Sequence, residues 1–338
     1  MAKKDLVRKS AWIILFVFLF FIPIIIREPY TLHIFCFIAF QVIFASSLRL
    51  VLSVGELSLA HAAFMGIGAY TSALVSIKLN LSFWLALPMA GLASMVIALP
   101  IGYISLRLRG AYFLMLTFAF AEIIRMLLSN FWVGFFGGIP GITNIPSPSI
   151  NIPGLLRIDF MSKAHYYYLA LALTSLTVFT MQRIEKSRIG MVFNAIKEAD
   201  ILAEAVGINR MRQKVLAFMI GCFFAGIAGS FYAHFIHIIT PHDFALHALM
   251  LPAAYMIIGG MSSVAGPVIG TVFLMLLSHF FLRQFGFYEM LIYGILTVVF
   301  ILLMPQGLIG LPRQVFLLLN RLGGRISAQD KNNGIARN

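Results

Sequence analysis

The chain has 338 residues, of which 61% are hydrophobic and only 11% are charged, and its formal net charge is +13. A soluble globular protein averages about 45–50% apolar and about 25% charged residues, so this composition excludes an ordinary soluble protein and indicates a polytopic membrane protein. The excess of lysine and arginine is then expected to mark the cytoplasmic ends of membrane spans, and no nucleic-acid partner is predicted.

The N-terminus combines a basic start, MAKKDLVRK, with an apolar run from Ala11 to Ile26. A secretory signal peptide has the same pattern but ends in a small-residue cleavage site. Here the run ends in Arg27-Glu28-Pro29. The sequence therefore predicts an uncleaved first span.

Further apolar runs follow along the chain, and about 20 apolar residues suffice to cross the hydrocarbon core of a bilayer. The segment Leu57–Ile77 is rich in small residues, which predicts a span packed inside a helix bundle rather than against lipid. Residues 132–164 are rich in proline and are predicted to form an external loop with little regular structure. The other predicted crossings are Leu32–Leu52, Phe83–Leu106, Tyr112–Val133, His165–Met181, Val215–Ile236 and Tyr288–Met304.

Residues 183–214 form the one long hydrophilic passage between apolar runs. They contain seven Lys or Arg residues and four acids, so this loop is predicted to be cytoplasmic. Its centre, Asn194–Val206, is predicted as one amphipathic helix that stops at Gly207. Such a helix needs either lipid headgroups or a soluble partner for its apolar stripe, which consists of Ile196, Ala199, Leu202, Ala203 and Val206.

The distribution of cations predicts the topology. With the N-terminus inside, nineteen of the 25 Lys and Arg residues lie on the cytoplasmic side, five lie outside and one, Arg125, lies in a span. A cytoplasmic C-terminal tail then requires Ala248–Leu282 to form two short passages that turn between Gly259-Gly260 and Gly266-Pro267. The prediction is an all-α fold of about ten transmembrane or re-entrant helices. It divides into a membrane half (1–182), a cytoplasmic loop (183–214), a second membrane half (215–312) and a cytoplasmic tail (313–338).

Two glycine-containing segments resemble each other. Ala62–Ser72 and Ala253–Ser263 share six identities in eleven positions, and the predicted topology runs them in opposite directions. An inverted repeat of this kind often lines a transport path. Chance similarity between two stretches rich in small residues is the alternative.

Four ionisable residues are candidates for function, because a charged side chain inside a membrane span costs free energy unless it is paired or hydrated. Glu56 and His61 flank the start of the small-residue segment; either they are functional, or Glu56 caps the N-terminus of the helix. Glu122 and Arg125 are three residues apart and can pair on one helix face. Their pair could be structural or could contact substrate.

No catalytic constellation is present in the sequence. It contains no Ser-His-Asp pattern, no HExxH and no phosphate-binding GxxxxGK[ST] loop, so we predict neither an enzyme nor ATP hydrolysis by this chain. His234 and His237 could share a helix face, but no second close pair or cysteine supports a metal site, and no cofactor is predicted. Cys36 and Cys222 lie in apolar runs and are predicted to be packing residues.

Six segments, in order, resemble the LivM-type permease of branched-chain amino acid ABC importers, over about residues 35 to 312. They are GELSLAHAAFMGIGAYTSAL (55–74), LRLRGAYFLMLTFAFAEIIRML (106–127), GGIPGI (137–142), SRIGMVFNAIKEADILAEAVGINRMRQKVLAFMIGCFFAGIAGSFYAH (187–234), IIGGMSSVAGPVIGT (257–271) and MPQGLIG (304–310). The sequence departs modestly from the family pattern, with Ala111 after the Arg-Gly turn and Glu56 in the first motif.

The resemblance implies a permease in the bacterial inner membrane with both termini in the cytoplasm. Its implied partners are a second, LivH-type permease, two cytoplasmic ATPase subunits, a periplasmic or lipid-anchored binding protein and membrane lipid. The central loop would contain the coupling helix that docks into an ATPase groove, with the coupling residues Glu198, Ala199, Asp200, Ala203, Glu204, Ala205 and Gly207. The candidate translocation-path residues are Glu56, His61, Gly66, Gly68, Tyr70, Tyr112, Glu122, Gly259 and Gly260.

Three other functions compete with import of branched-chain amino acids. Permeases for urea or short amides look similar. An ion-coupled secondary transporter would need a membrane carboxylate, for which Glu56, Glu122 and Glu289 are available, but it would not explain the acidic central helix. An intramembrane enzyme lacks a catalytic constellation. The acidic, small-residue character of the central helix favours a protein groove over a lipid surface.

Overall fold

A computed structural model describes residues 20–24, 28–152, 156–159, 162–280, 286, 288–303 and 307–310. The described residues are mostly helical, with one two-stranded hairpin. The chain divides into two compact units, residues 1–253 and 254–338, and each is described by itself. This architecture agrees with the predicted all-α membrane fold, whereas the number of ten segments remains a prediction.

Among the described residues, four helices are long and apolar enough to cross a membrane: α2 (Pro29–Leu52), α4 (Phe83–Ser105), α5 (Ala111–Asn130) and α10 (Arg210–Ile236). Their bounds lie close to those expected from the apolar runs. Two further helices, α3 (His61–Lys78) and α7 (Lys163–Glu185), coincide with the predicted segments Leu57–Ile77 and His165–Met181.

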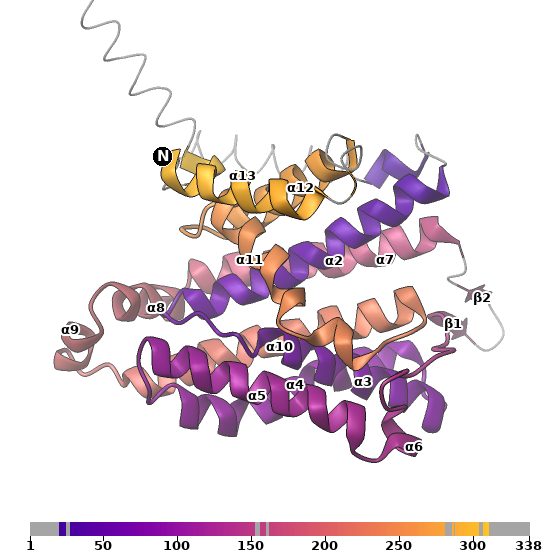
Figure 1. Ribbon diagram of the computed structural model, residues 1–338, viewed down its shortest axis with the longest axis horizontal. Coiled ribbons are helices and arrows are strands. Elements are labelled where there is room, and N and C mark those ends of the chain that lie inside the picture. The colour runs from indigo at the N-terminus through magenta and orange to yellow at the C-terminus, as the bar shows by residue number, and fades with distance from the viewer. Residues whose placement is uncertain are drawn as a thin grey trace, which may run out of the picture. The chain divides into compact units, whose positions relative to one another are not determined.

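Helix α10 is central to the first unit, where α2, α3 and α4 pack against it (Figure 1). Small residues allow close approach of the backbones, because a Cβ atom at Gly68 of α3 would overlap the backbone of Gly226 in α10. The small-residue segment therefore packs inside a bundle, as predicted. Its helix begins at His61, and residues 56–60 form a non-helical segment before it.

The proline-rich loop has more regular structure than we predicted. It contains the short helix α6 (Val133–Phe136) and an antiparallel hairpin of β1 (Ser149–Ile152) and β2 (Leu156–Asp159). Helix α6 precedes the first proline of the loop, and proline is compatible with a short edge pairing such as that of β1 and β2, which explains the difference. After α10, the 3-10 helix η1 (Pro241–Phe244) begins with a capping box between Thr240 and Asp243.

The prediction of one helix over Asn194–Val206 is wrong. The structure has two helices, α8 (Arg188–Glu198) and α9 (Asp200–Ala205), separated by Ala199, whose φ of −152° and ψ of 79° are not helical. Residues on the predicted stripe consequently point in different directions. The expected stop at Gly207 is confirmed, since its φ is +87° and helical hydrogen bonding ends there.

The second unit begins within α11 (His247–Gly259) and contains α12 (Ala265–Phe280), α13 (Glu289–Leu303) and the 3-10 helix η3 (Leu308–Gly310). The predicted break in Ala248–Leu282 is confirmed, because α11 ends at Gly259 and Gly260 has a φ of +115°. The two helices meet closely: a Cβ atom at Gly259 would overlap the carbonyl group of Gly266. The tail 313–338, and the first span apart from residues 20–24, lie outside the described residues.

Candidate functional site

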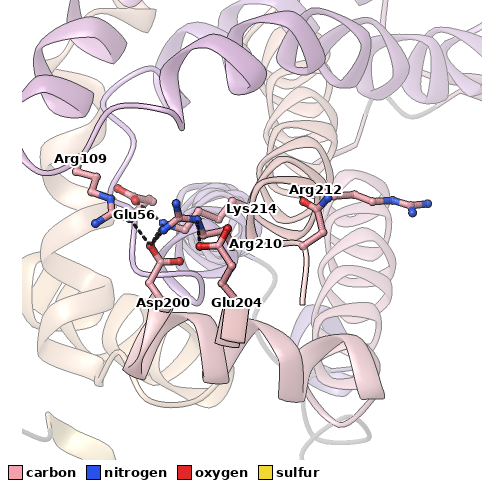
Figure 2. A network of polar contacts seen from close by, with 8 residues as sticks. Glu56, Arg109, Asp200, Glu204, Arg210, Arg212 and Lys214 are labelled. Carbon is pink, nitrogen blue, oxygen red and sulfur yellow. Dashed lines mark hydrogen bonds and ion pairs between the residues drawn. The ribbon is translucent and has the colours of Figure 1, made fainter. Parts of the chain in front are cut away.

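A buried lysine at the N-terminal end of α10 joins two carboxylates from distant parts of the chain. Lys214 Nζ donates to Glu56 Oε1 at 3.0 Å and lies 3.6 Å from Asp200 Oδ2 (Figure 2). The side chains of Lys214 and Glu56 are only 9% and 10% exposed. Buried charges of this kind are tolerated only when they are paired. Glu56 does not cap α3, whose N-cap is Ala60, so the capping interpretation is wrong.

Asp200, the first residue of α9, is the centre of a wider set of ion pairs. Its Oδ2 atom lies 3.3 Å from Arg210 and 3.4 Å from Arg109, and Arg210 Nε also contacts Glu204 at 3.2 Å. We call Glu56, Arg109, Asp200, Glu204, Arg210 and Lys214 the charged network (Figure 2). Its three cations and three carboxylates balance, and its members range from the nearly buried Glu56 to Arg109, which is 61% exposed.

The charged network connects four parts of the first unit. Glu56 belongs to the segment that leads into α3, Arg109 to the turn between α4 and α5, Asp200 and Glu204 to α9, and the other two cations to α10. Helix α9 therefore contacts α10 directly and is joined to the segment before α3 through Lys214. The ion pairs thus link the predicted cytoplasmic loop to the start of α3 and to α10.

The outward side of α9 is apolar. Ile201, Leu202 and Val206 are 70%, 68% and 77% exposed, and we call them the α9 surface. Exposed apolar side chains that gather on one part of a protein surface are typical of a protein-binding surface. Ala203 is instead 4% exposed and packs within the chain. Of the other predicted coupling residues, Glu198, Glu204, Ala205 and Gly207 are exposed and Ala199 and Asp200 are partly buried.

Sequence reasoning found Glu56, Asp200 and Glu204 but missed the three cations that join them. Lys214, Arg210 and Arg109 were counted only as cytoplasmic charges. A weak signal for Lys214 was available, because it stands at the start of a long apolar helix, where a charge requires a partner. The partner itself, 158 residues away, could not be identified from spacing.

The candidate path residues of α3 lie in the interior. His61 is fully buried, with its Nε2 atom 2.8 Å from Ser47 Oγ. Tyr70 is 2% exposed and its ring contacts Phe244. A Cβ atom at Gly66 would also press on the ring of Phe244, as one at Gly68 would on α10.

The remaining path candidates are elsewhere. Tyr112 is 72% exposed on α5, and Glu122 of the same helix pairs with Arg125, as predicted. Gly259 and Gly260 form the break in the second unit. The structure therefore gathers four candidates in the interior on α3 and two on an exposed face of α5.

A second polar site lies at the C-terminal end of α10. His234 is 1% exposed; its Nε2 atom is 2.9 Å from Ser72 Oγ and its Nδ1 atom 2.7 Å from the Pro146 carbonyl oxygen. His237 Nδ1 lies 2.8 Å from the carbonyl oxygen of Ile145. We call Ser72, Ile145, Pro146, His234 and His237 the histidine cluster. It fastens the loop before β1 to α10, and both ring nitrogens of His234 are occupied by protein partners.

A family model described as the permease component of branched-chain amino acid transport systems matches residues 30–304. The chain is 33% identical over 285 residues to the high-affinity branched-chain amino acid transport system permease protein LivM of Escherichia coli K12, covering 79% of this chain and 66% of that protein. The LivM protein of Salmonella typhimurium LT2 is 33% identical over 278 residues, covering 77% of this chain and 65% of that protein.

A shorter similarity relates the chain to a second type of permease. The permease protein LivH of E. coli K12 is 32% identical over 145 residues, covering 42% of this chain and 45% of that protein. The chain spans just under two thirds of the length of the LivM proteins that it matches. No solved structure matches the chain significantly.

Proposed function

Because the chain belongs to the family of permease components of branched-chain amino acid transport systems, we propose that it is the membrane subunit of an ATP-driven importer. Its substrates would be branched-chain or related hydrophobic amino acids. The chain is a multi-pass helical membrane protein, and in this proposal it forms half of the translocation path. Both of its termini would lie in the cytoplasm, as the distribution of cations predicts.

The proposed partners are a second, LivH-type permease, two cytoplasmic ATPase subunits and an external binding protein that is periplasmic or lipid-anchored. Similarity to both LivM and LivH proteins supports a pair of related permeases. The sequence contains no phosphate-binding loop of its own, which supports separate ATPase subunits.

The observation that supports docking of a cytoplasmic partner is the α9 surface, which lies on the helix that begins with Asp200 of the charged network. Ile201, Leu202 and Val206 are exposed on a short helix, and the same helix is held to α10 by Asp200. A partner bound to these side chains would displace α9. The displacement would pass from Asp200 to Lys214, and from Lys214 through its buried ion pair with Glu56 to the start of α3.

We also propose a division of roles among the residues singled out by the sequence. Residues 183–214 are the coupling loop between two membrane halves, 1–182 and 215–312, with the tail 313–338 in the cytoplasm. About ten segments cross or re-enter the membrane, and Ala62–Ser72 and Ala253–Ser263 belong to an inverted repeat. The translocation path includes Glu56, His61, Gly66, Gly68, Tyr70, Tyr112, Glu122, Gly259 and Gly260.

Reconstitution tests the function. The chain in liposomes, together with a LivH-type permease, the ATPases and a binding protein, should take up leucine only when ATP is inside the vesicles with the ATPases. Ion-driven uptake by this chain alone would show a secondary transporter. Uptake of urea or short amides, but not of leucine, would show that the proposed substrate class is incorrect.

Docking on the α9 surface has its own test. Leu202→Glu places a charge in the proposed contact and should weaken co-purification of the ATPases about tenfold or more, whereas the shape-conserving Leu202→Met should retain them. Leu202 is a better probe than Ala203, because a large side chain at the buried Ala203 would disturb α9 itself. Equal recovery of the ATPases with both Leu202 variants would remove α9 as the docking site.

A further inference from the structure

Helix α5 carries an exposed stripe that includes two charged residues. Tyr112, Met115, Ile123 and Met126 are 72%, 67%, 60% and 51% exposed and recur at spacings of three to eight residues, which places them on one side of a helix. The side chains of Glu122 and Arg125 are 35% and 30% exposed and lie beside this row, with Arg125 the farther from Ile123 around the helix. We call Tyr112, Met115, Glu122, Ile123, Arg125 and Met126 the α5 stripe.

The charged pair is well formed and lies deep in the helix. Arg125 Nε donates to the two carboxylate oxygens of Glu122 at 2.9 and 3.0 Å, and a terminal nitrogen of Arg125 also contacts Glu122 Oε1. Helix α5 has 20 residues and is therefore about 30 Å long, the thickness of a bilayer core. Glu122 lies close to its midpoint, and Arg125 lies about one turn further toward the C-terminal end.

Comparison with α4 shows that this position is unusual for a surface in contact with lipid. Helix α4 exposes Leu92, Val96 and Leu99 at 52%, 67% and 49%, and no charged residue occurs between Phe83 and Ser105. Charged groups inside a membrane span are costly in hydrocarbon, and they almost always face a bundle interior or a water-filled cavity. The apolar α4 face fits lipid, whereas the ion pair of the α5 stripe fits contact with water.

We propose that the α5 stripe lines a water-filled part of the transport route and that Glu122 and Arg125 bind the charged groups of a zwitterionic amino acid. This inference rests on the proposed function and names the substrate-contacting residues. The guanidinium group of Arg125 is suited to the substrate carboxylate, which it can bind through two parallel hydrogen bonds. The carboxylate of Glu122 accepts hydrogen bonds from the substrate ammonium group.

The rest of the α5 stripe complements an aliphatic side chain. Met115, Ile123 and Met126 flank the charged pair, and methionine adapts to apolar groups of different shape. The pair exchanges its internal hydrogen bonds for bonds to the substrate, so every charge stays paired in both states. Binding is therefore weak and reversible, as passage through a membrane requires.

Cysteine labelling tests whether the stripe meets water. The chain contains only Cys36 and Cys222, both buried, so single cysteines can be introduced into the unaltered chain. In the assembled importer, Met115→Cys, Ile123→Cys and Met126→Cys should react with a charged, membrane-impermeant thiol reagent. The matched variants Leu92→Cys, Val96→Cys and Leu99→Cys on α4 should stay unreacted. Unreactive cysteines on α5, or equal reaction on both helices, would overturn the proposal.

Transport by neutral variants tests substrate contact. Glu122→Gln and Arg125→Gln should each lower leucine uptake about tenfold or more, the effect of losing one charge-assisted hydrogen bond, while the ATPases still co-purify. Wild-type uptake by both variants would overturn the proposal even if the α5 cysteines react. A wild-type importer that takes up no leucine would instead refute the proposed function, and the labelling result would still report on α5.

Discussion

The two ends of α10 are held to their neighbours by different chemistry. At the N-terminal end, the charged network joins Lys214 to Glu56 and Asp200, and its members become more exposed toward α9. At the C-terminal end, His234 makes hydrogen bonds to Ser72 and to the backbone of Pro146 in a dry setting. Salt bridges tolerate a change of partner, whereas directional hydrogen bonds in a packed interior fix one geometry. We propose that the N-terminal end of α10 moves during transport and that its C-terminal end stays fixed.

Removing the buried cation should have the largest effect. Lys214→Met leaves Glu56 buried without its partner, and breaking a buried ion pair in this way typically costs about 3–5 kcal/mol. We expect a large loss of stability, measured as resistance to unfolding in mixed micelles, together with loss of leucine uptake. Lys214→Arg, which keeps the charge, is the control and should be affected much less. Unchanged stability in Lys214→Met would remove the basis of the comparison.

The histidine cluster should respond differently. His234→Ala leaves Ser72 and the Pro146 carbonyl group without their bonds to the ring, at a cost of about 1–3 kcal/mol. The expected result is faster proteolysis in the loop around Pro146, with coupling between ATP hydrolysis and residual transport unchanged. His237→Ala, which breaks one bond to Ile145, should loosen the same loop less. Uncoupling in either variant would show that this end also takes part in transmission.

The end of α9 offers a smaller and more local change. Gly207 has a φ of +87° with no neighbouring atom close to where a side chain would stand, so strain and not collision decides the outcome. A residue other than glycine in this region costs roughly 1–2 kcal/mol. Gly207→Val should weaken binding of the ATPases while leaving the membrane helices intact. Gly207→Asn should weaken it less, because asparagine tolerates a positive φ. Identical co-purification with both variants would contradict this.

The exposed edge of the charged network should matter least. Arg109 is 61% exposed, and exposed ion pairs contribute about 0–1 kcal/mol. Arg109→Gln should therefore leave stability almost unchanged, and any effect on uptake should shrink further at high salt. A loss of stability as large as that of Lys214→Met would show that the contribution of an ion pair in this network does not depend on its burial.

Sequence patterns anticipated the features that depend on neighbouring residues. The apolar runs gave the helices close to their observed bounds, because span length follows from hydrophobicity alone. The break at Gly259-Gly260 was predicted from the cations of the C-terminal tail, and the stop at Gly207 was predicted because helices often end at glycine.

Features that depend on distant residues were not anticipated. The sequence did not predict the break at Ala199 within residues 194–206, because the spacing of apolar residues across this segment fits a single helix. The cations that hold Asp200 and so fix the direction of α9 come partly from another loop and from α10. The pairing of Glu56 with Lys214 likewise arises only when α3 and α10 pack together through Gly68 and Gly226.

The central claim is that the charged network transmits movement from α9 to the membrane core, and one variant separates this role from simple stability. The double change Glu56→Leu with Lys214→Met replaces both buried charges by apolar side chains of similar size, and such a replacement is often neutral for stability. The decisive measurement is leucine taken up per ATP hydrolysed by the reconstituted importer. Our account predicts that the double variant folds and binds its ATPases like the wild type but hydrolyses ATP with little uptake. A wild-type ratio of uptake to hydrolysis would contradict it.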